Sequence, residues 1–430
     1  MKKYESYKDS GIEWIGEIPS HWEVRKLKFV VKYILGGGTP NSLNSKYWSD
    51  KLNENSYLWV SIADITNSEY IQDTKKYITK EGLKNSSAKI VPPYSILYSI
   101  YASLGKVAYS NKELTTNQAI LSIILKSEYY YKFIFYYLKT LTQIAIHLSN
   151  STTQDNISLE ILKNLYILTP PLPEQKQIAS FLDEKVDKIE KAISKKEKLI
   201  KLLKEQKQII INEAVTKGID KNVEYKDSGV EWIGKIPKHW EVRKLKFLLR
   251  LCNDKVEIKN HKVIALENLN SWNGKFIETN SKYQGEGVLF KENDILFGKL
   301  RPYLAKVYHC EEKGVAFGDL LVYRPIKEIY SKYSFYYMIS SDFIKIVDSS
   351  TYGTKMPRAS VDFINNLEFV FPPLPEQQKI VSYIEEKISK IDNLIQLQQK
   401  QIEKLKEYKT ILIDEVVTGK IKVCNNKDSK

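Results

Sequence analysis

The sequence predicts a protein of the α/β class (α+β), with two mixed α/β domains joined by two long helices that form an antiparallel coiled coil. Three observations lead to this prediction. A block of 23 residues (Tyr7–Phe29) recurs, a charged helical segment that begins with PPLPEQ recurs, and the regions between these repeats differ from each other. Because both repeats return in the same order, they indicate a tandem duplication and an internal pseudo-two-fold repeat.

The composition is that of a globular protein with an excess of basic residues. The 430 residues include 66 Lys and Arg against 52 Asp and Glu, a formal charge of +14. This balance favours a polyanionic partner such as nucleic acid, although many basic proteins bind none. No apolar run approaches the ~18 residues of a membrane-spanning helix, and the N-terminus lacks the apolar segment of a secretion signal. We therefore expect a cytoplasmic protein that does not contact a membrane.

The 23-residue repeat, here called the frame, comprises Tyr7–Phe29 and Tyr225–Phe247. Its four tryptophans could be buried for packing or could anchor a partner protein, and the pattern WIG-x-IP-x-HW favours packing. The near-identity of the copies also leaves a shared partner open. The tryptophans are Trp14, Trp22, Trp232 and Trp240. The two copies agree at 20 of 23 positions and differ at Ile12/Val230, Glu17/Lys235 and Ser20/Lys238.

The PPLPEQ repeat predicts two long helices. From about Glu174 the chain contains neither Pro nor Gly until Gly218, which leaves room for a helix of roughly 43 residues. Apolar residues follow the 4–3 spacing of a coiled-coil seam in both copies, so we favour an antiparallel pair within the chain over seams that face other chains. The seam comprises Leu182, Val186, Ile189, Ile193, Ile200, Leu203, Ile210 and Ala214, and Ile384, Ile388, Ile391, Ile395, Ile402, Leu405, Leu412 and Val416. Polar residues fill two equivalent gaps, at Lys196 and Lys207 and at Gln398 and Lys409.

The variable regions, residues 30–169 and 248–371, predict mixed α/β domains. Short β-rich runs bounded by Asn, Ser, Gly and Pro are typical of strands, and an apolar-periodic stretch near the end of each region is typical of a helix. In the first region we predict strands at Tyr57–Ile62, Ala88–Val91, Ser95–Ser99, Lys106–Tyr109 and Ala119–Leu125, and a helix at Tyr129–His147. In the second we predict strands at Val263–Leu266, Ile295–Phe297, Val307–His309 and Leu320–Arg324, and a helix at Ser331–Asp348.

Catalytic and metal-binding signatures are missing from the sequence. It has no GxxxxGK[ST] phosphate loop, no GxGxxG fingerprint and no [DN]PP[FY] tetrapeptide of an amino-methyltransferase. The five His have no metal-ligand spacing, and Cys252, Cys310 and Cys424 fit neither a disulfide framework nor a CxxC site. We therefore expect no catalysis, no metal and no cofactor on this chain. A fused methyltransferase or nuclease is the enzymatic alternative that the missing motifs disfavour.

Both variable regions contain polar loops of the kind that contact DNA. Phosphates are bound by Lys and Arg, and base edges by Asn, Gln, Ser, Thr and Arg. Any one such loop fits ordinary turn chemistry, but the set, in a basic duplicated protein, predicts base contact. The candidates in the first region are Thr39, Asn41, Ser42, Asn44, Lys46, Ser103, Lys106, Asn117, Gln118, Thr153, Gln154 and Asn156. Those in the second are Lys299, Arg301, Tyr303, Lys306, Tyr352, Thr354, Lys355 and Arg358.

The two regions differ in their arginines. Residues 30–169 contain no Arg, whereas residues 248–371 contain four. Arg is the commonest bidentate reader of guanine, and Asn and Gln suit adenine. We therefore predict that the second region depends more on G·C pairs, with Arg301 and Arg358 as the leading readers. Arg324 precedes Pro325 at a predicted strand end and also fits a structural role.

The order of these motifs resembles the specificity subunit of type I restriction–modification systems. The resemblance rests on GGTP after the first frame, TTNQA within the first variable region, and PPLPEQ at the start of each long helix. It implies two target recognition domains that each read one half of a bipartite DNA site, with the paired helices as a ruler between them. The domain boundaries would be 1–169, 170–219, 220–371 and 372–430.

The resemblance also implies partners and a lack of catalysis. The chain would bind double-stranded DNA and direct two methylation subunits and the restriction and translocation subunits to it. It would hold no cofactor itself, since S-adenosylmethionine, ATP and Mg²⁺ would belong to those partner subunits. The alternative is a non-catalytic coiled-coil scaffold that binds two protein partners through its variable domains.

Overall fold

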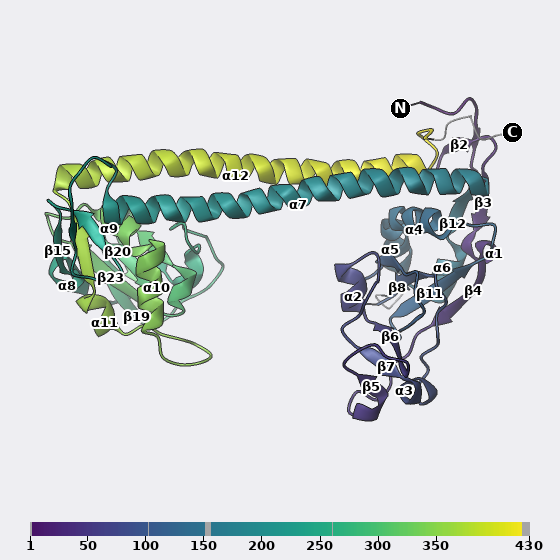
Figure 1. Ribbon diagram of the computed structural model, residues 1–430, viewed down its shortest axis with the longest axis horizontal. Coiled ribbons are helices and arrows are strands. Elements are labelled where there is room, and N and C mark those ends of the chain that lie inside the picture. Colours follow the sequence, from purple (N-terminus) through teal and green to yellow (C-terminus); the bar gives the residue numbers. More distant parts are fainter. Residues whose placement is uncertain (1, 102, 151–155, 260, 424–430) are drawn as a thin grey trace. The chain divides into compact units, whose positions relative to one another are not determined.

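The computed structural model describes residues 2–101, 103–150, 156–259 and 261–423 (Figure 1). The chain divides into two compact units. Unit 1 comprises Met1–Ser194 with Gln401–Lys430, and unit 2 comprises Lys195–Lys400. Each unit contains one mixed α/β domain and about half of each long helix, α7 (Leu172–Lys217) and α12 (Leu374–Val417).

The long helices pair in opposite directions, as the seam predicts. In unit 2, Lys196 of α7 donates a hydrogen bond to Gln398 of α12 at 3.0 Å, and Lys207 donates to Asp392 at 2.9 Å. Residue numbers therefore rise along α7 as they fall along α12. Lys196 and Gln398 are equivalent gap residues of the two repeats, and their contact is what an antiparallel pairing of two copies requires. The predicted antiparallel coiled coil is confirmed.

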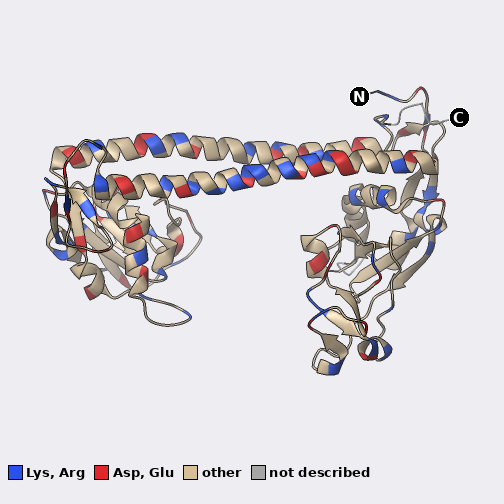
Figure 2. Cartoon of the chain, viewed as in Figure 1, with Lys and Arg blue, Asp and Glu red and all other residues tan. Residues whose placement is uncertain are grey.

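The second pair of gap residues forms the same ion pair in both units. Lys207 binds Asp392 in unit 2, and Lys409 donates to Glu190 at 2.6 Å in unit 1. The contacts are equivalent because Lys409 and Asp392 occupy the positions in the second helix repeat that Lys207 and Glu190 occupy in the first. Basic and acidic residues are interspersed along both helices (Figure 2). The duplicated ion pair therefore gives two similar helices a defined alignment.

Each frame folds into a hairpin followed by a strand and one short helix. Trp22 and Trp240 are fully buried, which confirms the packing interpretation for these two residues. Trp232 is half-buried against Tyr337 and Phe343, whereas Trp14 is 43% exposed. The elements of unit 1 are β1 (Tyr7–Asp9), β2 (Glu17–Pro19), β3 (Glu23–Lys26) and α1 (Leu27–Val30). Those of unit 2 are β13 (Tyr225–Asp227), β14 (Lys235–Pro237), β15 (Glu241–Lys244) and α8 (Leu245–Leu248).

The frame of each unit packs against the end of a long helix. After α12, Gly419 adopts a φ of +77°, and an added Cβ would lie 2.5 Å from the Pro19 ring. After α7, Gly218 adopts a φ of +75° beside Trp240. Both residues therefore end a helix in a left-handed conformation that favours glycine, and Gly419 also permits close contact with the frame.

Each α/β domain contains a main sheet and a second sheet of four strands each. In the main sheets Ile123 pairs with Ile34 and Ile96, and Tyr323 pairs equivalently with Leu251 and Ile295. The main sheet of unit 1 has the order β4 (Val31–Gly36), β11 (Ile120–Leu125), β8 (Ile96–Ser99), β9 (Val107–Tyr109). That of unit 2 has the order β16 (Leu249–Cys252), β23 (Leu320–Pro325), β20 (Ile295–Gly298), β21 (Val307–His309).

The second sheets differ between the units. The sheet of unit 1 has the order β10 (Leu114–Thr116), β6 (Ser56–Val60), β7 (Tyr77–Thr79), β5 (Trp48–Ser49). Short helices η1 (Ser45–Tyr47), α2 (Ile62–Asn67) and α3 (Lys80–Lys84) connect its strands. The sheet of unit 2 has the order β17 (Lys255–Glu257), β19 (Glu286–Phe290), β22 (Gly314–Ala316), β18 (Val263–Ile264). Helix η2 (Leu266–Asn268) follows β18, and helix η3 (Pro302–Leu304) lies between β20 and β21 of the main sheet.

Three predicted elements differ from the structure. The stretch Ala88–Val91 forms only an isolated bridge, from Val91 to Leu114, because the two prolines that follow have no N–H to donate to a ladder. Each predicted helix of the variable regions is two helices. They are α4 (Tyr131–Thr140) and α5 (Thr142–Asn150) in unit 1, and α9 (Ser331–Met338) and α10 (Ser341–Ser349) in unit 2.

The break in unit 2 has a local cause. The Ser340 hydroxyl donates to the Tyr337 carbonyl at 2.7 Å, while its own backbone is extended at the start of α10. A serine that bonds to nearby backbone competes with the helical hydrogen bonds and suits a helix boundary. In unit 1, the Thr142 hydroxyl donates to the Gly105 carbonyl at 3.0 Å, which ties the start of α5 to the β8–β9 loop.

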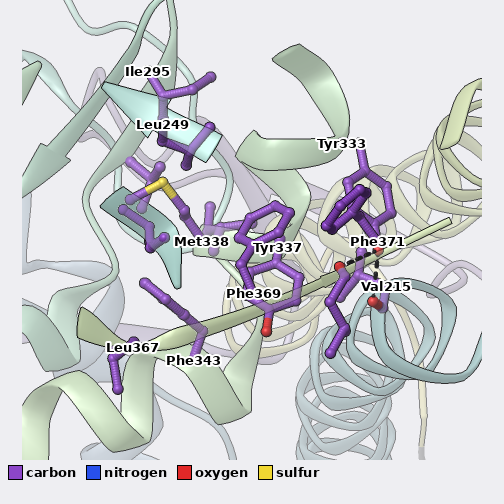
Figure 3. Packing of buried hydrophobic residues seen from close by; sticks show 14 of the residues in the cluster. Val215, Leu249, Ile295, Tyr333, Tyr337, Met338, Phe343, Leu367, Phe369 and Phe371 are labelled. Atoms are coloured by element: carbon purple, nitrogen blue, oxygen red, sulfur yellow. Dashed lines mark hydrogen bonds between the residues drawn. The ribbon is translucent and has the colours of Figure 1, made fainter. Parts of the chain in front are cut away.

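The core of unit 2 joins its domain to the helices (Figure 3). Tyr333 of α9 is fully buried, and its single hydroxyl proton is shared between the Val215 carbonyl of α7, at 2.9 Å, and the Val370 carbonyl, at 3.0 Å. Val370 lies on β24 (Glu368–Phe371), which pairs with β15 of the frame. Burial, reinforced by the nearby Glu376 carboxylate, raises the pKa of Tyr333 well above its ordinary value, so the hydroxyl keeps its proton.

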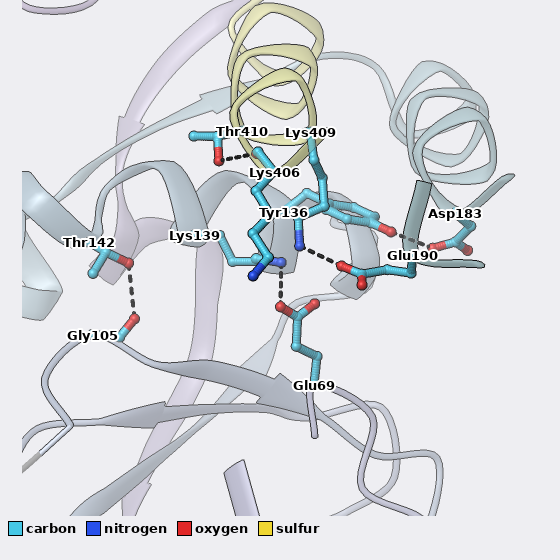
Figure 4. A network of polar contacts seen from close by, with 10 residues as sticks. All are labelled: Glu69, Gly105, Tyr136, Lys139, Thr142, Asp183, Glu190, Lys406, Lys409 and Thr410. Carbon is cyan, nitrogen blue, oxygen red and sulfur yellow. Dashed lines mark hydrogen bonds and ion pairs between the residues drawn. The ribbon is translucent and has the colours of Figure 1, made fainter. Parts of the chain in front are cut away.

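Polar contacts join the domain of unit 1 to α7 in a similar way (Figure 4). Tyr136 of α4 donates to Asp183 of α7 at 2.9 Å, close to the pair of Lys409 and Glu190. The strand β12 (Tyr166–Thr169), which leads into α7, pairs with β3 of the frame. Frame, domain and helix are therefore one packed structure within each unit.

The glutamine of PPLPEQ is a buried clamp in both copies. The Gln377 side chain accepts from the Tyr330 backbone N–H at 2.7 Å and donates to the carbonyls of Glu328 at 3.0 Å and Pro372 at 2.9 Å. Gln175 makes the equivalent three contacts in unit 1. Each glutamine therefore holds the start of α4 or α9 against the start of a long helix.

We predict that Gln377→Ala destabilises unit 2 by roughly 2–4 kcal/mol, because it removes a buried side chain that bonds three backbone groups and leaves the buried Pro372 carbonyl without this partner. Urea unfolding would measure the free energy of unfolding, and hydrogen exchange would localise the loss to α9 and the start of α12. Gln378→Ala is the matched control, because Gln378 is exposed, and it should change stability by less than about 0.5 kcal/mol. Equal effects of the two substitutions would contradict the clamp.

Candidate nucleic-acid interface

In unit 2, two loops that the sequence singled out and one that it did not, residues 317–319, meet at one end of the main sheet. They are residues 299–306 after β20, residues 317–319 before β23, and residues 350–359 before α11 (Val361–Asn366). The Lys299 N–H donates to the Asp319 carbonyl at 3.0 Å, the Ala359 N–H to the Lys299 carbonyl at 2.9 Å, and the Arg301 N–H to the Pro357 carbonyl at 2.7 Å. The predicted residues Arg301 and Arg358 are thus brought together by backbone hydrogen bonds.

Unit 1 joins its equivalent loops by the same contacts. The Ile100 N–H donates to the Ala119 carbonyl at 2.9 Å, and the Ile157 N–H donates to the Ile100 carbonyl at 3.2 Å, just before α6 (Leu159–Asn164). Thr153 and Gln154 lie outside the described residues, and Asn156 is the first described residue after them. Two regions of different sequence therefore hold their loops with one backbone scaffold.

The loop after β4 adds a further segment to the cluster of unit 1. The Gly38 N–H donates to the Thr116 carbonyl at 2.8 Å, and the Thr39 hydroxyl contacts the Gln118 side chain. The side-chain oxygens of Asn41 and Asn44 accept from backbone N–H groups within the loop at 3.0 and 3.1 Å. These two asparagines shape the loop, and the exposed residues that it presents include Ser42 and Lys46.

Arg301 and Arg358 have different environments. Arg358 makes a bidentate contact with Asp319, at 3.1 Å from Nε and 3.0 Å from Nη2, and this hydrogen-bonded carboxylate raises the pKa of the guanidinium. Lys299 lies 3.8 Å from the same carboxylate. Arg301 is exposed, has a φ of +50°, and donates from Nη2 to the Lys355 carbonyl at 3.2 Å. Arg358 therefore braces the loops, and Arg301 projects from them.

The other predicted residues divide into exposed and internally bonded groups. Lys306 is half-buried and donates to the Leu266 carbonyl at 2.6 Å. The Ser103 hydroxyl accepts from Thr66 at 3.3 Å, and the Asn117 side chain accepts from the Ala119 N–H at 3.2 Å. The exposed residues are Lys106, Gln118, Tyr303, Tyr352, Thr354 and Lys355.

Sequence reasoning missed Asp319, which bonds the three loops of unit 2 through its backbone and side chain. The signal was available, because Phe317-Gly-Asp319 follows β22 where Asn117-Gln-Ala119 follows β10. It also left the role of Arg324 open. The Arg324 guanidinium donates to the buried Asp294 carboxylate at 2.8 and 2.6 Å, which gives Arg324 a structural role.

Other kinds of site leave no trace in the described part of the chain. Within residues 2–101, 103–150, 156–259 and 261–423, no group of three or more His, Cys, Asp or Glu could hold a metal ion. Over the same residues, no helix is both long and apolar enough to cross a membrane. Cys252 and Cys310 are buried, and desolvation raises the pKa of both thiols, which keeps them protonated and unreactive.

The protein has two equivalent α/β domains, each packed against the pair of long helices and each with its own cluster of polar loops. This arrangement defines a protein with two separate recognition modules. Residues 19–202 and 237–407 match the family model described as the type I restriction modification DNA specificity domain. The chain belongs to this family, and its role is DNA sequence specificity in a type I restriction–modification system.

Relatives and solved structures agree with this assignment. The chain is 28% identical to the specificity subunit of the type I restriction enzyme MjaIX of Methanocaldococcus jannaschii and 26% identical to that of MjaVIII, over 95% of each chain. It resembles the HsdS subunit from Thermoanaerobacter tengcongensis with a TM-score of 0.52 at 13% identity, over 94% of this chain and 98% of that one. A chain from a type I R-M system structure on complex assembly gives a TM-score of 0.71 at 14% identity, with 94% and 99% coverage. These structures support the fold.

We predict that Arg301→Ala relaxes base preference at one position of the half-site read by unit 2, at a cost of about 1–3 kcal/mol in binding. Arg301→Gly should act alike and rules out a backbone effect, because glycine accepts the positive φ. Arg358→Ala loosens the loops and should weaken binding at every position of that half-site. Selection from randomised duplexes would measure these preferences, and uniform weakening by Arg301→Ala would make Arg301 a phosphate contact.

Proposed function

We propose that the chain selects an asymmetric, bipartite site in double-stranded DNA, with one half-site read by the loop cluster of each unit. The observation that carries this proposal is the contrast between scaffold and side chains. The loops of both units are held by the same backbone contacts, through Ile100 in unit 1 and Lys299 in unit 2. The side chains they present differ, so each unit offers its own set of donors and acceptors to the major groove.

The chemistry of the two clusters supports different half-sites. Unit 1 presents Gln118 beside Thr39, a neutral amide and hydroxyl suited to adenine. Unit 2 presents Arg301 on loops that are braced by the pair of Arg358 and Asp319, and a guanidinium suits guanine. The excess of 66 basic over 52 acidic residues adds attraction to phosphates that is independent of sequence.

The chain would act as the non-catalytic member of a larger assembly. Two methylation subunits would bind through the duplicated elements, and restriction and translocation subunits would complete the complex at the selected site. S-adenosylmethionine, ATP and Mg²⁺ would be held by those partners, and the assembly would act in the cytoplasm, where the DNA is. The near-identity of the frames supports a partner that binds twice in the same way.

Selection from randomised duplexes tests this function. The full chain, co-purified with the methylation subunit of its system, should enrich two short motifs separated by a fixed spacer. Exchange of residues 30–169 for the corresponding region of a relative should change one motif and leave the other. Enrichment of no motif would favour a protein scaffold instead, and enrichment of one continuous motif would contradict a half-site for each unit.

We predict that the helices set the spacer. Four residues inserted after Lys196 and four after Gln398, which face each other, should lengthen the spacer by one or two base pairs and leave both half-sites unchanged. The reason is that each residue adds ~1.5 Å of helix, ~6 Å in all, against ~3.4 Å for a base pair. An insertion in one helix alone should instead disturb the pairing. An unchanged spacer in a folded, active double insertion would refute the ruler.

A further inference from the structure

One apolar side chain of unit 1 is far more exposed than any other large hydrophobic side chain among the described residues. Leu43 is 93% exposed, and the next, Tyr352, is 65% exposed. Leu43 lies between Ser42 and Asn44 in the loop that joins β4 to η1. A single exposed leucine is ordinary on a protein surface, so its meaning depends on how firmly the loop holds it.

Two tryptophans hold the loop just before Leu43. The Trp59 indole N–H donates to the Gly38 carbonyl at 3.0 Å, and the Trp48 indole N–H donates to the Asn41 carbonyl at 3.2 Å. The two rings contact each other edge to face, with centroids 5.0 Å apart and an interplanar angle of 84°. The pair therefore fixes the backbone at two points on the way to Leu43.

The turn that carries Leu43 is closed by its own hydrogen bonds. The Leu43 N–H donates to Asn41 Oδ1 at 3.0 Å, and the Lys46 N–H donates to Asn44 Oδ1 at 3.1 Å. After the turn, the Thr79 hydroxyl donates to the Lys46 carbonyl at 2.8 Å. The backbone is thus anchored on both sides of Leu43, and the fold presents this side chain to solvent at a defined place.

The same loop begins in the base-reading cluster of unit 1. Its Thr39 hydroxyl contacts the Gln118 side chain, and exposed Ser42 and Lys46 lie on either side of Leu43. A surface of hydroxyls, amides and a lysine suits a DNA groove. The largest apolar surfaces that DNA offers to a leucine in such a place are the faces of the stacked bases.

We propose that Leu43 is a wedge that inserts between two base pairs of the half-site read by unit 1 and unstacks them. This inference rests on the proposed function, since it takes the half-site from there. Leucine is one of the apolar residues that unstack base steps when a protein inserts them into the duplex. Insertion covers both sides of a side chain that is almost wholly exposed in the free chain.

The wedge would serve the chemistry at this half-site. Enzymes that act on a base within a duplex first take that base out of the stack, which costs unstacking energy. A base step already opened by Leu43 lowers this cost for the methylation partner. The unstacking is then supplied by the chain that selects the site, so it occurs where the bases have been read.

Two other contacts fit Leu43 less well. A thymine methyl group would cover only one side of the leucine. A methylation subunit that binds both units alike would require an apolar counterpart in unit 2, but over residues 253–259, the described residues directly after β16, no large hydrophobic side chain is exposed. The leucine therefore belongs to what unit 1 alone recognises.

Fluorescence of 2-aminopurine tests the wedge, because this base is brighter when it is unstacked. The full chain with its methylation subunit is bound to the duplex that selection enriches, and 2-aminopurine replaces one base of the unit 1 half-site at a time. At least one position should brighten with the parent chain and not with Leu43→Ala. Leu43→Met, which keeps a long apolar side chain, should restore the signal.

Leu52→Ala is the matched control, at a 48% exposed leucine of the same domain, and it should leave every signal as in the parent. The affinity of Leu43→Ala for the duplex should change by less than about tenfold, because the gain from covering the leucine is spent on unstacking the bases. Signals in the half-site of unit 2 should be the same in all variants.

The outcomes separate this inference from the proposed function. A selected bipartite site with no signal that depends on Leu43 would overturn the wedge and leave the proposed function in place. Failure to select any such site would overturn both. If Leu43→Ala kept every signal but lost a preference for thymine over deoxyuridine, the leucine would contact a methyl group. Loss of the methylation subunit from this variant would make Leu43 a protein contact. Either result would overturn the proposal.

Discussion

The architecture depends on the pairing of one helix with a second copy of itself in the opposite direction. A single apolar seam on a helix of more than 40 residues has to be covered, and the duplication supplies the cover within the same chain. Polar residues in the seam then give the pair a defined alignment. Lys207 is only 9% exposed, and its ammonium group pairs with the carboxylate of Asp392. A shift of one helix along the other would therefore leave this ammonium group without a partner.

The long helices also organise the domains, because the contacts that join domain to helix are repeated. Gln175 and Gln377 hold the starts of α4 and α9, and the tryptophans Trp22 and Trp240 fill the space between frame and helix. These contacts involve the frames, the helix starts and the first turns of α4 and α9. The loops of the candidate interface take no part in these contacts. Their side chains can therefore change without loss of the packing between domain and helix.

The candidate interface follows the same division between backbone and side chain. Backbone hydrogen bonds from Ile100 and Lys299 hold equivalent loops in place, and they are insensitive to the side chains around them. Specificity can then reside in a few positions. In unit 2, the contact of Arg358 with Asp319 adds the rigidity that Arg301 would need in order to read a base, since a guanidinium discriminates only when its approach is defined.

The sequence by itself determined the duplication, the antiparallel helices and eight of the nine strands that it predicted, because periodicity and repeats can be recognised without knowledge of tertiary contacts. It also identified the loops as a set. The tertiary structure decided how their side chains are used: Lys306 and Arg324 are bonded internally, and Asp319 became the centre of a cluster. It also split the helix predicted at Ser331–Asp348 into two. These hydrogen bonds and ion pairs join residues that lie far apart in the sequence. The type of a residue alone does not determine which of these distant residues its charged group will contact.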